Sequence, residues 1–180
     1  MMGTKRGLAV AVCAAVVLMA GCSRSPAVHS DASWAEHYSS VADMTAHSAL
    51  VIQGTVTDNS GRHKESSVQI ADSTVAITKV LSDPGHLVTN AAGKLISPTV
   101  VVGQTAGTGG QTQEISDDPI FKKNEQVVLF LRVASPGHYA VVGGPNGRLT
   151  VSNGAIKPFN AESVPFTGNA NDLAAAVTKK

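Results

Sequence analysis

The amino-acid sequence predicts a mainly β fold: a small β-barrel or sandwich of about six or seven strands, with a short N-terminal helix and a C-terminal helix. Two observations support this prediction. Short apolar runs, several of them alternating with polar residues, recur between clusters of Gly, Pro, Asn and Asp, which is typical of strands joined by turns. A helical spacing of apolar residues occurs only near the start and the end of the part that follows the leader.

Residues 33–47 form the predicted N-terminal helix. Ser33 is placed to cap it, and Glu36 completes a capping box. The apolar residues of this segment fall at spacings of three and four, on one helical face: Trp34, Tyr38, Val41 and Met44. Two interpretations of Trp34 and Tyr38 stay open. They pack the helix onto the domain, or they belong to a ligand or partner surface.

The pattern then changes to period two. A first strand is expected at 49–58, ended by the turn cluster Asp58-Asn59-Ser60-Gly61. A loop with a short ordered piece is expected at 82–97, because Asp83-Pro84-Gly85 interrupts the apolar pattern. The continuous apolar run at 99–102 indicates a strand that is buried on both faces.

A long second strand is expected between these, at 66–81. Its apolar residues change parity along the strand: first Val68 and Ile70, then Val75, Ile77 and Leu81. A strand changes face only where an extra residue is inserted. We therefore expect a bulge or a break near 71–74.

The second half of the chain predicts a central strand followed by hairpins. Residues 126–133 are the most apolar stretch after the leader and are the expected central strand. A strand at 139–142 follows, and Ser152-Asn153-Gly154 then joins two short strands in the strongest hairpin signal of the chain. Residues 172–177 close the chain as a helix, with Asn169 or Asn171 near its cap.

This order of helix, strand, long bent strand, apolar strand and late hairpins resembles the layout of OB-type and netrin-like small β-barrels. The resemblance concerns the layout of the whole domain and rests on no specific motif.

Residues 1–22 predict an export signal with a lipid-attachment site. Lys5 and Arg6 precede an uncharged apolar run at 7–20, which is shorter than the roughly 20 residues of a membrane-spanning helix. Leu18-Met19-Ala20-Gly21-Cys22 resembles the bacterial lipobox, with Met19 in place of the usual Leu. The alternative is an ordinary secretory signal with a chance cysteine.

The lipobox resemblance implies that the chain is cut after Gly21 and that Cys22 carries a diacylglyceryl group and a further acyl chain such as palmitate. Residues 1–21 are then a signal peptide, 22–32 a flexible tether and 33–180 a single β-rich domain. A bacterial lipoprotein of this kind is held at the extracytoplasmic face of the cell membrane. Only two cysteines occur in the sequence, Cys13 and Cys22, so the expected domain has no disulfide.

No motif for catalysis stands out. The six histidines have no metal-site spacing, so we expect no metal and no cofactor besides the lipid; a structural site assembled from distant loops stays open. A formal net charge of +1 and the lack of a basic stripe argue against nucleic acid. The one enzymatic arrangement considered would bring Asp117, Asp118 and His138 together.

Three functions are therefore weighed. The first is a non-enzymatic domain that binds a protein or an envelope component through loops on a rigid scaffold. The second is a carrier of a small apolar ligand or lipid inside a barrel, which would require an enlarged interior. The third is an envelope enzyme.

Overall fold

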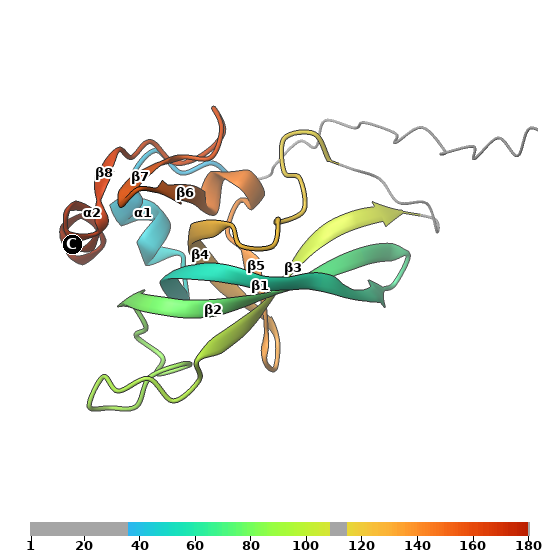
Figure 1. Cartoon of the computed structure of the whole chain (residues 1–180), viewed down its shortest axis with the longest axis horizontal. Helices are drawn as coiled ribbons and strands as arrows, with labels where there is room; N and C mark the ends of the chain where they lie inside the picture. Colours follow the sequence, from blue (N-terminus) through green and yellow to red (C-terminus); the bar gives the residue numbers. More distant parts are fainter. Residues whose placement is uncertain (1–35, 109–114, 180) are drawn as a thin grey trace, which may run out of the picture.

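Residues 36–108 and 115–179, which the computed structural model describes, form one eight-stranded sheet with two short helices (Figure 1). Strands β1 to β4 are Leu50–Glu65, Val68–Ser82, Thr99–Thr108 and Gln126–Ser135. Strands β5 to β8 are His138–Val141, Arg148–Ser152, Ala155–Pro158 and Gly168–Asn169. Helix α1 is Val41–Ala46, helix α2 is Ala170–Thr178, and a 3-10 turn, η1, spans Gly144–Gly147. The mainly β class and the two terminal helices are confirmed, with more strands than expected.

The strand order is β1-β2-β3-β5-β4-β6-β7-β8, and β1 also pairs with β4. Hydrogen-bonded neighbours therefore run from β1 through β2, β3, β5 and β4 back to β1. The pairing of β3 with β5 is parallel and short, from Val101 to Gly103 on β3, whereas the other pairings of this cycle are antiparallel. Strands β6 to β8 continue from β4 as an antiparallel extension.

Strand β4 is central, as predicted, because it pairs with β1, β5 and β6. Its residues from Val127 to Leu131 are completely buried. Val127, Leu129 and Leu131 join one apolar cluster with residues of β1, β2, β3 and β5. Val128 and Phe130 join a second cluster with both helices and β6. The continuous apolar run thus arises because both faces of β4 are covered.

The turn expected at 58–61 is wrong, because β1 continues through it to Glu65. The pairing of β1 with β2 shifts register between Val56 and Asp58 and again between Asp58 and Gly61. These turn-favouring residues therefore form irregularly paired positions within the strand, because cross-strand pairing outweighs their local preference for a turn. The actual turn follows Glu65, where Ser66 has a φ of 56°.

The irregularity expected near 71–74 is found in the pairing, but its extra residues belong to β1 and not to β2. Two β1–β2 register shifts lie opposite Asp72 to Val75, whereas Asp72, Ser73 and Thr74 pair with β3 without interruption. Val68 and Ile70 do not need to reach the core, because they line a surface cavity while Ala71 and Val75 are buried in the opposite direction.

The predicted N-terminal helix is shorter than expected. Glu36 to Ser40 are not helical, and the cap is Ser40, whose Oγ accepts a hydrogen bond from the Asp43 backbone N–H at 3.1 Å. As a cap, a serine side chain accepts a hydrogen bond from a free backbone N–H of the first turn, which it cannot do from inside the helix. Ser33 lies outside the described residues, so the proposed capping box is replaced by the Ser40 cap.

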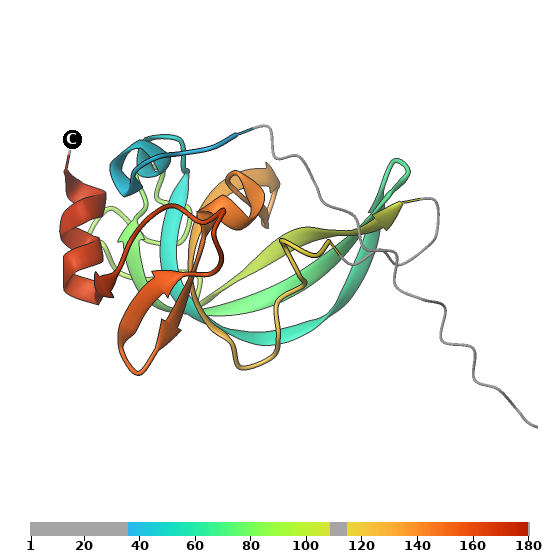
Figure 2. The same cartoon turned by 90° about the horizontal axis from the view of Figure 1, so that it is seen from above.

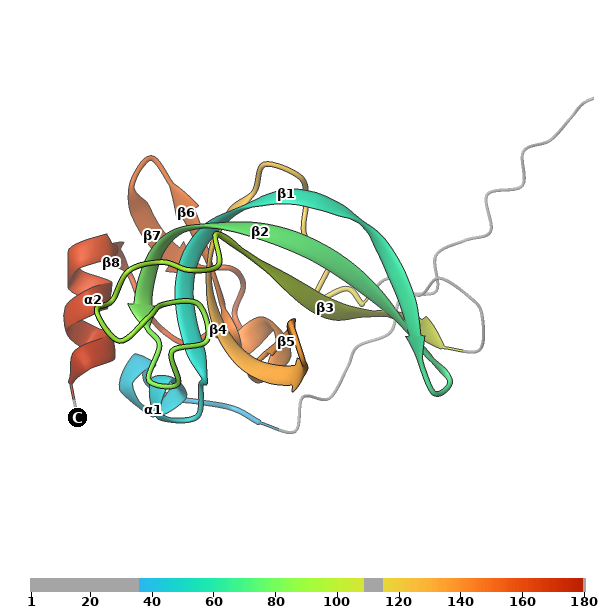
Figure 3. The same cartoon turned by 90° about the horizontal axis from the view of Figure 1, so that it is seen from below.

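The C-terminal predictions are confirmed. Strands β6 and β7 pair as a hairpin through Asn153 and Gly154, whose φ values of 50° and 79° suit a two-residue turn. Asn169 caps α2 in a capping box with Asp172. The two helices lie together at one end of the molecule, and the β1–β2 hairpin reaches out at the other (Figures 2 and 3).

The loop expected at 82–97 is confirmed, with its ordered piece. The Asp83 carboxylate accepts hydrogen bonds from the backbone N–H groups of Leu87, Val88 and Thr89 and from the Thr89 hydroxyl. A single β-bridge joins Thr89 to Leu95. One half-buried carboxylate thus supplies the acceptors that a loop backbone needs.

Candidate functional site

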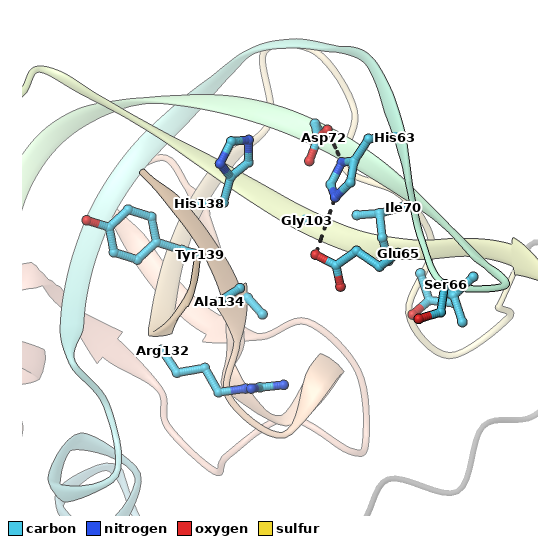
Figure 4. Close-up of a pocket in the computed structure, with 13 residues that line it drawn as sticks. His63, Glu65, Ser66, Ile70, Asp72, Gly103, Arg132, Ala134, His138 and Tyr139 are labelled. Carbon is cyan, nitrogen blue, oxygen red and sulfur yellow. Dashed lines mark hydrogen bonds and ion pairs between the residues drawn. The ribbon is translucent and has the colours of Figure 1, made fainter. Parts of the chain in front are cut away.

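A cavity of about 510 Å³ lies between the outer halves of β1 and β2 and the hairpin that joins β4 to β5 (Figure 4). Five strands contribute to its lining. We call this cavity the groove. It combines titratable side chains with an apolar floor, which is the general composition of a binding site.

The polar side of the groove comes from β1 and β2. His63 and Glu65 alternate along β1 and so point to the same face. Asp72 projects beside them from β2. The His63 Nδ1 atom lies 2.6 Å from Asp72 Oδ2, and Nε2 lies 3.4 Å from Glu65 Oε1. Figure 4 shows His63 held between these two carboxylates.

The two carboxylates change the protonation of the imidazole. The hydrogen bond with Asp72 raises the pKa of His63, burial opposes this, and Glu65 adds to the rise. Asp72 keeps one spare acceptor, because its Oδ1 is buried and has no hydrogen-bond partner among the described residues. The cluster therefore contains one buried acceptor oxygen that its own side chains leave unsatisfied.

The facing side of the groove comes from β4 and β5. His138 contacts the His63 ring edge to face, with ring centroids 5.9 Å apart. Arg132 lines the groove and is exposed, and Tyr139 lines it while being almost buried. Burial, followed by the charge of Asp83, raises the pKa of the Tyr139 phenol. This wall therefore offers a positive charge opposite the carboxylates, whereas the Tyr139 ring belongs to the first apolar cluster.

The floor of the groove depends on a glycine. A Cβ at Gly103 would lie 2.9 Å from Ile70 Cγ2, a distance that side chains do not tolerate without moving. The missing side chain lets Ile70 of β2 lie over β3. Val68 and Ile70 thereby give the groove its apolar surface.

A smaller cavity of about 110 Å³ adjoins the groove and shares Gly103 and Arg132 with it. It ends at Asp118, whose Oδ1 accepts a hydrogen bond from Gln104 Nε2 at 3.1 Å. Burial raises the pKa of Asp118 to about 6, although the nearby Arg148 guanidinium and the Gln104 hydrogen bond act in the opposite direction.

The sequence-predicted site residues lie apart from the groove or outside the described residues. Cys22 and Trp34 belong to the undescribed N-terminal segment. Tyr38 packs against the second apolar cluster, and its backbone N–H donates to Asn146 Oδ1 at 3.0 Å. Its hydroxyl donates to Glu36 at 3.1 Å. Tyr38 does not line the groove.

The three residues of the enzymatic hypothesis lie in different settings. His138 lines the groove, and Asp118 lines the smaller cavity beside it. The Asp117 carbonyl accepts a hydrogen bond from Asn160 Nδ2 at 2.6 Å. The structure pairs His138 with His63 and Asp118 with Arg148.

Sequence reasoning missed His63, Glu65 and Asp72. The signal was present, because His63-Lys64-Glu65 alternates and so places two titratable side chains on one strand face. A first strand that ends at 58 excludes these residues. The parity change in β2 is a second signal, because Val68 and Ile70, which precede it, form the floor of the groove.

A scan against protein-family models found no match, and a search of curated proteins found none either. In the part of the chain that the structure describes, no helix combines the length and apolar character needed to cross a bilayer.

Proposed function

We propose that this chain is a bacterial lipoprotein whose β-rich domain binds a protein or an envelope component in the groove, at the extracytoplasmic face of a membrane. The observation that supports this most is the groove itself, which gathers two imidazoles, two carboxylates and a guanidinium over an apolar floor. A partner with polar and charged groups suits such a surface.

The strand pairing supports a more specific architecture. The cycle of β1, β2, β3, β5 and β4 is consistent with a small five-stranded barrel, to which β6 to β8 and the helices are added. OB-folds are partly open five-stranded barrels that bind ligands on the face of strands 2 and 3, between the loops that join strands 1–2 and 4–5. The groove occupies the corresponding position, which favours its use as a binding surface.

The alternative of an apolar carrier is less well supported. The space within the strand cycle is filled by a cluster of buried side chains that includes Phe121, Leu129 and Leu131. A carrier of the type considered requires an interior that side chains leave empty.

Crosslinking in intact cells tests the binding function. A photoreactive amino acid at Ala134, which is exposed and lines the groove, should give a specific adduct. The same group at exposed Ser152, on β6, is the matched control and should not give this adduct. Ala134→Trp should then abolish capture of the partner, whereas Ser152→Trp should not. An adduct from both positions, or from neither, would contradict binding in the groove.

The anchor is tested separately. Cys22→Ser should abolish lipid labelling and release the protein from membranes. Serine lacks the thiol that carries the lipid, and stable anchoring requires more than one acyl chain. Cys13→Ser is the matched control, since the lipobox pattern assigns no lipid to Cys13. Unchanged membrane retention of Cys22→Ser would show that residues 1–22 are not a lipoprotein signal.

A further inference from the structure

The tip of the loop between β2 and β3 exposes adjacent apolar side chains. Residues 90–96, which we call the loop tip, are all exposed. In the part of the chain that the structure describes, three large apolar side chains are exposed, and two of them are Leu95, at 38%, and Ile96, at 61%. Single exposed apolar residues are ordinary on a protein surface, whereas contiguous ones mark a surface that contacts something else.

Hydrogen bonds within the loop hold the tip in one conformation. The side-chain Oδ1 of Asn90 accepts from the backbone N–H groups of Ala92 and Lys94, at 3.1 and 2.9 Å. The Asn90 backbone N–H donates to the Lys94 carbonyl at 2.9 Å. An Asn that bonds the backbone ahead of it in this way stabilises a turn. Leu95 and Ile96 are therefore presented to the solvent by an ordered turn.

The charged groups around the loop tip are cationic. Residues 84–98 contain Lys94 and His86 and no Asp or Glu, and Asp83 directs its carboxylate to the loop backbone. Lys79 of β2 lines a cavity of about 220 Å³ together with Leu95. Neither lysine forms an ion pair with another described residue. Two unpaired ammonium groups therefore flank the apolar side chains.

This composition suits a lipid bilayer better than a protein partner. Residues 84–98 contain no aromatic residue, whereas protein interfaces are enriched in aromatic residues and depleted in Lys. Apolar side chains flanked by lysines insert at the boundary between headgroups and acyl chains, while the ammonium groups attract anionic lipids. The loop leaves β2 at the end opposite the β1–β2 hairpin (Figure 1), so a membrane under the tip leaves the groove clear.

We propose that the loop tip inserts shallowly into the surface of an anionic bilayer, with Leu95 and Ile96 below the headgroups and Lys79 and Lys94 against lipid phosphates. Two aliphatic side chains are too few to retain the protein by themselves. A tether elsewhere in the chain brings the tip to the membrane, and the tip then orients the domain. This insertion goes beyond the proposed function, because it requires neither a lipid on Cys22 nor a partner in the groove.

Fluorescence on vesicles tests the insertion. A C-terminal histidine tag and a nickel-chelating lipid hold the full-length chain on vesicles of phosphatidylethanolamine and phosphatidylglycerol, so that the test does not depend on Cys22. An environment-sensitive fluorescent amino acid replaces Ile96 or, in the matched control, the exposed Val133 of β4. The emission at 96 should shift to the blue and be quenched by lipids with brominated acyl chains. The emission at 133 should stay unquenched.

Substitutions then separate the apolar part of the contact from the charged part, with the probe kept at 96. Leu95→Asn should remove most of the quenching, whereas Val133→Asn should leave it unchanged. Lys94→Gln should lower the ratio of inserted to free tip about fivefold, which corresponds to about 1 kcal/mol per cation near an anionic surface. Phosphatidylcholine in place of phosphatidylglycerol should lower this ratio further, because both lysines then lose the attraction. Circular dichroism establishes that each variant is folded.

Three results would overturn the membrane contact. They are the absence of quenching at 96, equal quenching at 96 and 133, and a blue shift that occurs without vesicles and grows with protein concentration. The last result would assign the loop tip to a contact between copies of this chain. None of them bears on crosslinking from Ala134 or on lipid labelling of Cys22, so failure of the insertion is distinguishable from failure of the proposed function.

Discussion

Two clusters in this domain place a basic side chain between two carboxylates, one buried and one open. In the buried cluster Arg148 lies between Asp118 and Glu125, and its side chain is 2% exposed. In the open cluster His63 lies between Asp72 and Glu65, and its side chain is 35% exposed. Both clusters place one basic side chain between two carboxylates, and they differ in their surroundings and in the basic group itself.

In the buried cluster, protein groups replace most of the hydrogen bonds that water would form with the Arg148 guanidinium. Arg148 Nη2 donates to Glu125 at 2.7 Å, and Nη1 donates to the Pro119 carbonyl at 2.7 Å. The Phe121 and Phe159 rings lie over the guanidinium at 4.4 and 3.8 Å. An arginine keeps its charge at any ordinary pH, so this cluster fixes segment 118–125 against β6.

In the open cluster the groups are only partly used. His63 Nε2 has only the long 3.4 Å contact with Glu65, and Asp72 Oδ1 has no partner among the described residues. An imidazole can also release its proton near neutral pH. The buried cluster therefore contributes to the stability of the fold, whereas the partial exposure of His63 and Glu65 leaves these side chains accessible to a ligand. Four predictions test this contrast.

The largest effect is expected from Arg148→Met. Removal of the guanidinium leaves Asp118 and Glu125 without their buried counter-charge, and breaking a buried pair in this way costs about 3–5 kcal/mol. Urea denaturation at pH 7 should show a loss of this size in unfolding free energy. Arg132→Met, in the exposed groove, is the matched control and should change it by less than about 0.5 kcal/mol. Equal effects would contradict a structural role specific to Arg148.

The next effect is a pH dependence centred on Asp118. Burial raises its pKa from 3.8 to about 6, so the folded protein binds this proton more tightly than the unfolded chain. The contribution of Asp118 is therefore fully present below about pH 4 and falls as the pH rises to about 6, by up to about 3 kcal/mol.

Asp118→Asn measures this dependence, because asparagine cannot ionise and retains the oxygen that accepts from Gln104. The unfolding free energy of the variant relative to wild type should rise by up to about 3 kcal/mol between pH 4 and pH 7. Denaturation curves of both proteins at each pH give this difference. If this free-energy difference stays constant, or if the variant loses stability relative to wild type as the pH rises to 7, Arg148 keeps Asp118 ionised in the folded protein.

A smaller effect is expected from Phe159→Leu. The ring lies 3.8 Å from the Arg148 carbon Cζ, and a cation over a desolvated aromatic face contributes up to about 2 kcal/mol. Phe166→Leu is the matched control, because Phe166 packs against the second apolar cluster. Phe159→Leu should cost more than Phe166→Leu in the same denaturation assay, by about 1 kcal/mol. Equal costs would assign the stabilisation to apolar burial alone.

The two clusters also differ in how far the sequence predicts them. The class of fold, the central strand and the Asn153-Gly154 hairpin follow from local pattern and turn chemistry, and all were confirmed. Neither cluster follows from local pattern. Arg148 meets Asp118 and Glu125 only because β6 pairs with β4, which is a contact between distant parts of the chain.

The groove was missed for a related physical reason. Asp58-Asn59-Ser60-Gly61 has the composition of a turn, and only pairing with β2 holds it in a strand. Once β1 is extended, His63 and Glu65 lie on the groove face with Val68 and Ile70 opposite. Long-range register, which one sequence does not reveal, therefore decides where the candidate site forms.

The smallest effect is expected from His63→Gln, and it tests the open half of the comparison. The pair with Asp72 is partly exposed, with side-chain exposures of 35% and 16%, and such pairs contribute about 0–1 kcal/mol. The unfolding free energy at pH 7 should therefore fall by no more than about 1 kcal/mol, well below the loss in Arg148→Met. A loss as large as that of Arg148→Met would mean that His63 is committed to holding the fold. The contrast between an enclosed and an accessible cluster would then fail.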